Sequence, residues 1–140
     1  MTKRFRLALK AGDRVYLNGA LVRADRAVTL ELLNEAVFLL DAYIMAPEAA
    51  TTPLRQIYIE VQALLIDPEA NDARRRACTE AIAMLKAAAA SAPLRLGLTA
   101  VANHVAADRL IEALKTLRDL AALEDLQRAP TPARRSEPLA

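Results

Sequence analysis

Residues 14–23 read Arg-Val-Tyr-Leu-Asn-Gly-Ala-Leu-Val-Arg. Apolar residues flank the Asn18-Gly19 pair, and Asn and Gly accept the positive φ angles that a two-residue type I′ turn requires. The stretch therefore predicts a β-hairpin. The turn also sets the register, so Arg14 is expected opposite Arg23 and Tyr16 opposite Leu21, all four on one face of the hairpin.

Two arginines directly opposite each other destabilise a strand pair unless a negative group lies over them. We interpret this pair as part of a phosphate-binding face, with Tyr16 and Asn18 placed to stack on, or hydrogen-bond to, an unpaired base. Other cations along the N-terminal strands extend the face. The predicted RNA-binding residues are Arg4, Arg6, Lys10, Arg14, Tyr16, Asn18, Arg23 and Arg26.

Apolar residues alternate with polar ones on both sides of the hairpin. Strands are expected near residues 5–9, in the hairpin itself, from residue 28 onward, and in the apolar run 36–40. The first forty residues thus predict about five short antiparallel strands.

From Pro47 the apolar period changes to that of a helix. Thr52 is a good N-cap and Pro53 suits the first helical position, so a helix is expected from Pro53 to the Asp67-Pro68 stop. Three more helices are expected, over residues 71–90, from Ser91 through about Val105, and from an Asp108 cap to about Leu126. The fold class is therefore α+β, a small antiparallel sheet followed by a four-helix bundle.

We divide the chain into a basic sheet region (1–45), a helical bundle region (46–128) that forms one compact unit with the sheet, and a disordered tail (129–140). The tail has no periodicity and contains three prolines.

The 140 residues are 54% hydrophobic with a net charge of +2, so composition alone does not indicate nucleic-acid binding. The charge is uneven, however. Residues 1–27 carry seven Lys or Arg against two Asp, a net of +5, whereas residues 28–69 carry one Arg against seven acids, a net of −6. Such asymmetry can orient a polyanion or a partner subunit.

The single cysteine excludes an intramolecular disulfide, and neither a secretory leader nor an apolar run long enough to span a bilayer is visible. We expect a cytoplasmic protein without a membrane association.

Catalytic chemistry is not indicated. His104 and Cys78 stand alone, and the scattered glycines form no phosphate-binding loop, so no metal, cofactor or enzymatic activity is predicted. The run Arg74, Arg75 and Arg76 opens a predicted helix, where cations oppose the positive end of the helix dipole. It is a secondary basic patch, to be interpreted as an exposed basic turn, as a contact to acids such as Glu31 and Glu35, or as a contact to RNA.

Three segments carry a family resemblance. Residues 9–23 (LKAGDRVYLNGALVR), 52–62 (TPLRQIYIEVQ) and 112–118 (EALKTLR) resemble the FlbT flagellar regulators of alphaproteobacteria, and the likeness covers roughly residues 5–125. The resemblance implies a post-transcriptional regulator that binds the 5′ untranslated leader of flagellin mRNA, represses translation and promotes decay of the message. It also implies a FlaF-type flagellar regulator as a partner.

An alternative is a protein–protein interaction module, or a chaperone-like adaptor in flagellar assembly, that acts on mRNA only indirectly. The size of the bundle relative to the sheet and the acidic middle of the chain favour this alternative. A homodimer is also expected, because a short sheet with open strand edges tends to be completed by pairing.

Overall fold

The computed structural model describes residues 5–67, 69 and 72–126, together with the helical backbone of 127–128. Arg4 and the predicted tail, 129–140, lie outside the described residues. The elements, in chain order, are β1 (Phe5–Leu9), β2 (Arg14–Leu17), β3 (Ala20–Arg23), β4 (Val28–Leu32), β5 (Phe38–Leu40), the 3₁₀ turns η1 (Asp41–Tyr43) and η2 (Pro47–Ala49), α1 (Pro53–Ile66), α2 (Asp72–Ala88), α3 (Ala92–Ala106) and α4 (Leu110–Arg128). The α+β fold class, with five strands before four helices, is confirmed.

The hairpin prediction is confirmed in its turn and in its register. Asn18 and Gly19 have φ angles of 46° and 96°, as a type I′ turn requires. Arg14 pairs with Arg23 and Tyr16 with Leu21 across β2 and β3.

The five strands form two small antiparallel sheets. Sheet A contains β1 and β4, and sheet B has the order β3-β2-β5. The two sheets pack on a small shared core of three buried side chains, Leu7, Leu9 and Val15. Neighbouring strand residues point to opposite faces of a sheet. Leu7 and Val15 point into this core, so their neighbours Arg6 and Arg14 lie on the outer faces of sheet A and sheet B.

Local signals account for the start of two helices. The Thr52 hydroxyl accepts a hydrogen bond from the Arg55 backbone N–H at 3.2 Å, and the Ser91 hydroxyl accepts one from Leu94 N–H at 3.3 Å. Both caps have extended backbone, and each precedes a Pro in the first turn of its helix. The predicted start of α1 is confirmed.

The predicted cap of α4 is wrong. Asp108 has a left-handed φ of 61°, whereas an N-cap needs extended backbone, and α4 begins two residues later at Leu110. The tight turn between α3 and α4 uses Asp108 as its left-handed residue, a conformation that Asp tolerates better than most residues. Its carboxylate binds Arg75 on α2 instead.

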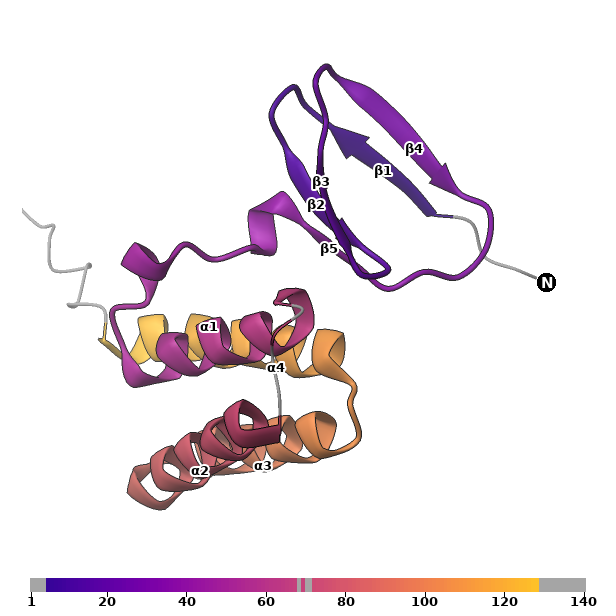
Figure 1. Ribbon diagram of the computed structural model, residues 1–140. Coiled ribbons are helices and arrows are strands. Elements are labelled where there is room, and N and C mark those ends of the chain that lie inside the picture. Colours follow the sequence, from indigo (N-terminus) through magenta and orange to yellow (C-terminus); the bar gives the residue numbers. More distant parts are fainter. Residues whose placement is uncertain (1–4, 68, 70–71, 129–140) are drawn as a thin grey trace, which may run out of the picture.

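The four helices form a closed ring in which each contacts its two neighbours, and α1 and α4 lie between the sheets and the α2–α3 pair (Figure 1). Two residues of sheet B, Tyr16 and Leu39, join the bundle core. The helical residues of that core include Leu54, Ile57, Tyr58, Val61, Cys78, Ile82, Leu98, Val101, Val105, Leu114 and Leu117. Tyr58 is 3% exposed in this core.

The connector from β5 to α1 is held by side chains of α1. The Gln62 amide accepts from Met45 N–H at 2.8 Å and donates to Met45 C=O at 3.0 Å. The Tyr58 hydroxyl donates to Tyr43 C=O at 2.6 Å. These bonds fix the path of residues 43–45 against the bundle, and with it the position of the sheets.

Candidate nucleic-acid interface

Four of the predicted site residues meet at one end of the sheets. The turns on either side of the hairpin lie together there, because Gly12 N–H donates to Ala24 C=O at 2.7 Å and Ala24 N–H donates to Asp13 C=O at 2.9 Å. Lys10, Arg14, Arg23 and Arg26 come from residues 10–14 and 23–26, which we call the basic end.

The negative group over the arginine pair belongs to the protein itself. Asp41 of η1 accepts hydrogen bonds from Arg14 Nε at 2.9 Å and from Arg14 N–H at 3.0 Å. These bonds, with a smaller contribution from Arg23, hold the pKa of the Asp41 carboxyl below its usual value. The Arg14–Arg23 pair is therefore stable without phosphate, because an acid encoded 27 residues beyond Arg14 lies against it.

The remaining cations of the basic end face solvent. Arg26 Nε lies 3.6 Å from the Asp25 carboxylate, but both side chains are more than four-fifths exposed, so this ion pair is weak. Lys10 and Arg23 are exposed, and no carboxylate of the described residues lies within ion-pair distance of either side chain. The basic end thus offers exposed cations to an anion arriving from solution.

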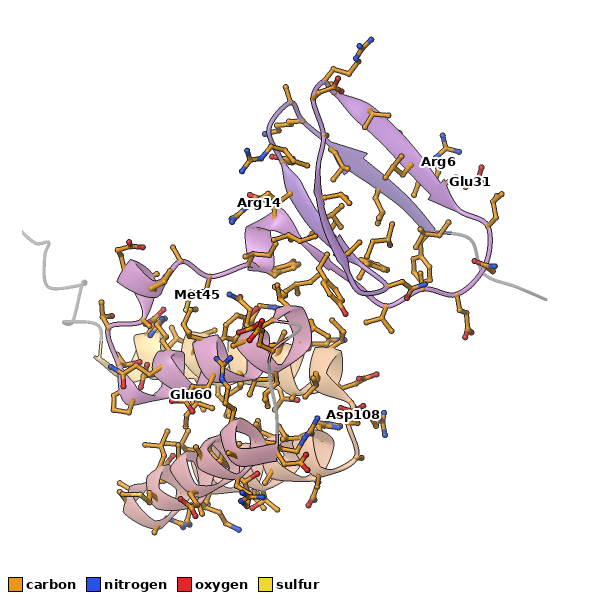
Figure 2. All side chains as sticks on the ribbon, in the orientation of Figure 1. Arg6, Arg14, Glu31, Met45, Glu60 and Asp108 are labelled. Carbon is orange, nitrogen blue, oxygen red and sulfur yellow. The ribbon has the colours of Figure 1, made fainter. Side chains whose placement is uncertain are left out.

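Arg6 does not belong to this group. It lies on the outer face of sheet A, opposite Glu31 in the β1–β4 register, whereas Arg14 lies on the other outer face, beside η1 (Figure 2). The expectation of a single continuous basic face is therefore wrong, because the sheet that carries Arg6 is folded back over the sheet that carries Arg14.

Tyr16 and Asn18 are placed differently from the prediction. The Tyr16 side chain is 7% exposed and packs in the bundle core, so its ring is not open to stacking by a base. Asn18 lies at the turn, at the end of the hairpin away from the basic end. Its side-chain oxygen accepts from Val37 N–H at 2.8 Å and its N–H donates to Val37 C=O, so it holds the segment before β5.

Two of the three arginines of the secondary basic patch, Arg74 and Arg75, make hydrogen bonds within the helical region. Arg74 Nη1 donates to the Asp67 carboxylate at 2.6 Å, across the α1–α2 connection. Arg75 donates to Val105 C=O at 2.7 Å and to Asp108 at 2.9 Å, and so ties α2 to the end of α3. The carboxylates that accept these hydrogen bonds belong to Asp67 and Asp108. Arg76 is exposed.

Sequence reasoning missed a cluster around Arg118. Its Cζ lies 3.9 Å above the Tyr43 ring, and its Nη1 donates to the Tyr58 hydroxyl at 3.1 Å. Burial raises the pKa of Tyr58, while the Arg118 guanidinium opposes that rise. No local pattern marks Arg118, because its partners are about sixty residues or more away in sequence.

Other chemistry is not supported. Burial raises the pKa of the Cys78 thiol to about 11, which leaves it protonated and a poor nucleophile at neutral pH. Within the described part of the chain, no three His, Cys, Asp or Glu side chains are grouped to hold a metal ion. Nor does that part contain a helix with the length and apolar character needed to span a membrane.

The comparisons with known proteins agree with the resemblance noted from the sequence. The family described as "Flagellar protein FlbT" matches residues 5–127. The "Probable flagellum biosynthesis repressor protein FlbT" of Rhizobium leguminosarum bv. trifolii (strain WSM2304) is 41% identical to this chain, and the alignment covers 89% of this chain and 84% of that protein. The protein of the same name from Chelativorans sp. (strain BNC1) is 40% identical, and the alignment covers 89% of this chain and 86% of that protein. The Brucella ovis protein of that name is 42% identical over 81% of this chain and 74% of its own length. No solved structure matches. The chain belongs to the FlbT family of flagellar proteins.

Proposed function

We propose that this protein is a post-transcriptional regulator of flagellum biogenesis that binds the 5′ untranslated leader of flagellin mRNA, represses its translation and promotes its decay. Relatives that carry the name of flagellum biosynthesis repressors support the flagellar role. The observation that carries the RNA-binding part is the basic end, where Lys10, Arg23 and Arg26 are exposed beside Arg14.

The Arg14–Asp41 pair supports the proposal rather than removing Arg14 from it. Asp41 accepts from Nε and from the backbone N–H of Arg14, and no described residue accepts from the two terminal nitrogens of that guanidinium. A carboxylate that orients an arginine in this way leaves its outer donors ready for a phosphate. Lys10, Arg23 and Arg26 supply further phosphate contacts, which position RNA without reading its sequence.

Binding alone suffices for this mechanism. A leader held on the basic end is kept from the ribosome and is presented to the decay machinery, so no catalytic group is required. The protein acts by occupancy, as a regulator rather than as an enzyme.

A gel-shift titration with the flagellin leader transcribed in vitro tests the proposal. The double variant Arg23→Ala, Arg26→Ala should bind the leader at least about tenfold more weakly, because two exposed phosphate contacts are lost. The matched control, Lys86→Ala with Lys115→Ala, removes two exposed cations from the helices and should bind as the wild type does. Equal affinity of both double variants would reject the basic end as the RNA site.

We also propose a homodimer that pairs along β3. This strand is the edge of sheet B and all four of its residues are exposed. In a two-residue hairpin the Leu21 backbone N–H points away from β2, toward the open edge of the sheet. Leu21→Pro therefore removes a hydrogen-bond donor that a partner strand would use, and leaves the hydrogen bonds between β2 and β3 intact. Sedimentation equilibrium should give a dimer for the wild type and a monomer for this variant; a wild-type monomer would contradict the dimer.

A further inference from the structure

A cleft of about 1020 Å³ lies between sheet B and the bundle. The segment before and within β5 forms one wall, and the last turns of α1 and the start of α4 form the other. Asp108, labelled in Figure 2, is one of its lining residues. The apolar lining is aliphatic and aromatic and comes from Val37, Phe38, Leu64, Leu65, Leu110 and Ile111.

One cation of the cleft, Arg118, makes no ion pair with a carboxylate of the described residues. Arg118 lines it, half-buried, stacked on Tyr43 and hydrogen-bonded to the Tyr58 hydroxyl, and no carboxylate of the described residues lies within ion-pair distance of it. A partly desolvated guanidinium gains from a carboxylate partner, and the aromatic ring compensates only part of the lost hydration. The two tyrosines already hold the side chain in place, so little freedom is lost when an anion binds.

The other charges of the cleft are placed differently. Asp108 accepts a hydrogen bond from Arg75 at 2.9 Å, whereas Arg109 is 59% exposed and makes only a weak 4.0 Å contact with Glu112. Arg118 is the cation that is partly desolvated and already held in place, so it is the position in the cleft where an incoming negative charge is best matched.

The rim and the size of the cleft indicate an extended occupant. Val37 and Tyr43 are 47% and 43% exposed at its edge, and exposed apolar groups around a groove are typical of interaction sites. Small-molecule pockets measure about 300–1,000 Å³, so this cleft has room for several side chains of a peptide.

We propose that this cleft binds a segment of a partner protein that lays aliphatic side chains on the apolar lining and places an Asp or Glu carboxylate on Arg118. RNA is the less suitable occupant, because the floor is apolar and the two cations of the lining, Arg109 and Arg118, share the cleft with the carboxylates of Asp108 and Glu112. The cleft includes the Asn18-Gly19 turn, whereas the basic end lies at the opposite end of the hairpin. The two surfaces are therefore separate, and both can be occupied at once.

Selection from a displayed library of random 12-residue peptides against the full chain tests the proposal. We expect enriched peptides in which an Asp or Glu is flanked by apolar residues. Their fluorescein-labelled forms should bind Val37→Glu at least tenfold more weakly in fluorescence anisotropy, because a carboxylate then lies on the apolar rim. Val28→Glu, which changes a Val of similar exposure outside the cleft, is the matched control and should leave binding unchanged.

A double-mutant cycle isolates the proposed ion pair. Changing the peptide acid to its amide should weaken binding to the wild type at least fivefold, but should have little effect on Arg118→Gln. Thermal unfolding followed by circular dichroism monitors the fold of each variant. Because Arg118 also contacts two tyrosines, Val37→Glu gives a second result that does not depend on this position.

Three outcomes would overturn the proposal. The first is a library that yields no enriched peptide. The second is a set of enriched peptides that bind Val37→Glu as tightly as they bind the wild type. The third is an RNA octamer that displaces the peptides from the wild type and itself binds Val37→Glu more weakly. Failure here does not affect the proposed function, because Val37→Glu should bind the flagellin leader as the wild type does.

Discussion

One carboxylate determines how the arginine pair of the hairpin is stabilised. Asp41 follows β5 directly, and the β2–β5 pairing brings it to Arg14. A pattern search within the hairpin finds two opposed cations and infers an external anion. The folded chain provides the anion from a neighbouring strand end, which only the tertiary pairing reveals.

The Asp41 carboxyl should make stability depend on pH. Its pKa is lowered in the folded state by the hydrogen bonds from Arg14. The resulting stabilisation is present above the unfolded-state pKa, near 3.8, and is lost as the pH falls through the lower folded-state value. Asp41→Asn should therefore reduce the free energy of unfolding at pH 7 by less than about 1 kcal/mol, since both side chains are about one-third exposed.

Urea unfolding at pH 7 and at pH 2.5 measures this difference. The gap between wild type and Asp41→Asn should narrow at the acid pH, because there the carboxyl is protonated in the unfolded state and the stabilisation from its lowered native pKa is reduced. Asp25→Asn is the control, because its carboxylate is 86% exposed and makes only a 3.6 Å contact. A gap that stays constant between the two pH values would show that the charge of Asp41 is not the stabilising feature.

At the scale of elements, the connector 41–50 depends on α1. Gln62 makes two hydrogen bonds to the backbone of Met45, one through its oxygen and one through its nitrogen. Gln62→Ala should lower the free energy of unfolding by about 1–3 kcal/mol, because it leaves the partly buried Met45 N–H and C=O without these partners. Gln56→Ala, on the exposed side of the same helix, should change it by less than about 0.5 kcal/mol. Chemical denaturation measures both, and equal effects would contradict a role of Gln62 in holding the connector.

The contact between α3 and α4 requires a glycine. A Cβ at Gly97 would lie 2.8 Å from Leu120 Cδ1 and 3.0 Å from Cγ, and Leu120 is itself buried. Alanine normally stabilises a helix relative to glycine by about 1 kcal/mol. At this position the clash should outweigh that gain, and Gly97→Ala should destabilise the protein by about 1–2 kcal/mol.

Thermal unfolding of Gly97→Ala and of the double variant Gly97→Ala, Leu120→Ala checks this explanation. The smaller side chain at 120 removes the clash, so adding the Gly97 change to Leu120→Ala should stabilise rather than destabilise. If Gly97→Ala lowers stability equally in both backgrounds, the helix contact is not the cause.

The features that the sequence predicted correctly are those determined by residues close together in the chain. Asn18-Gly19 predicted the hairpin turn and Thr52-Pro53 predicted the start of α1, and both are observed. The cap of α4 failed, because Asp108 responds to the turn and to Arg75 on another helix. The same limit applies to the site. The hairpin register was predictable, but the burial of Tyr16 and the position of Arg118 depend on how sheet B packs on the bundle.

At the scale of the whole molecule, the packing of sheet B on the bundle separates two surfaces. Tyr16 and Leu39 bury one face of sheet B against the helices, while the basic end remains in solvent (Figure 1). The cleft includes the Asn18-Gly19 turn at the other end of the hairpin, and none of Lys10, Arg14, Arg23 and Arg26 lines it. Under the two proposals above, the protein would hold a message and a protein partner together, and substitutions at one surface should leave binding at the other unchanged.

Under the proposed function, the number of cations at the basic end sets the salt dependence of RNA binding. Four of them contact phosphate, Arg14 through its outer donors and Lys10, Arg23 and Arg26 as exposed side chains, and each neutralised phosphate of a single strand contributes about −0.7 to the slope of log K against log salt. We therefore expect a slope of about −2.8 for the flagellin leader, and about −1.4 for Arg23→Ala, Arg26→Ala. Filter binding from 50 to 300 mM KCl measures both slopes, and Lys86→Ala with Lys115→Ala should keep the wild-type value. A wild-type slope well beyond about −3 that is unchanged in Arg23→Ala, Arg26→Ala would mean that RNA lies along a different and larger basic surface than the end of the sheets.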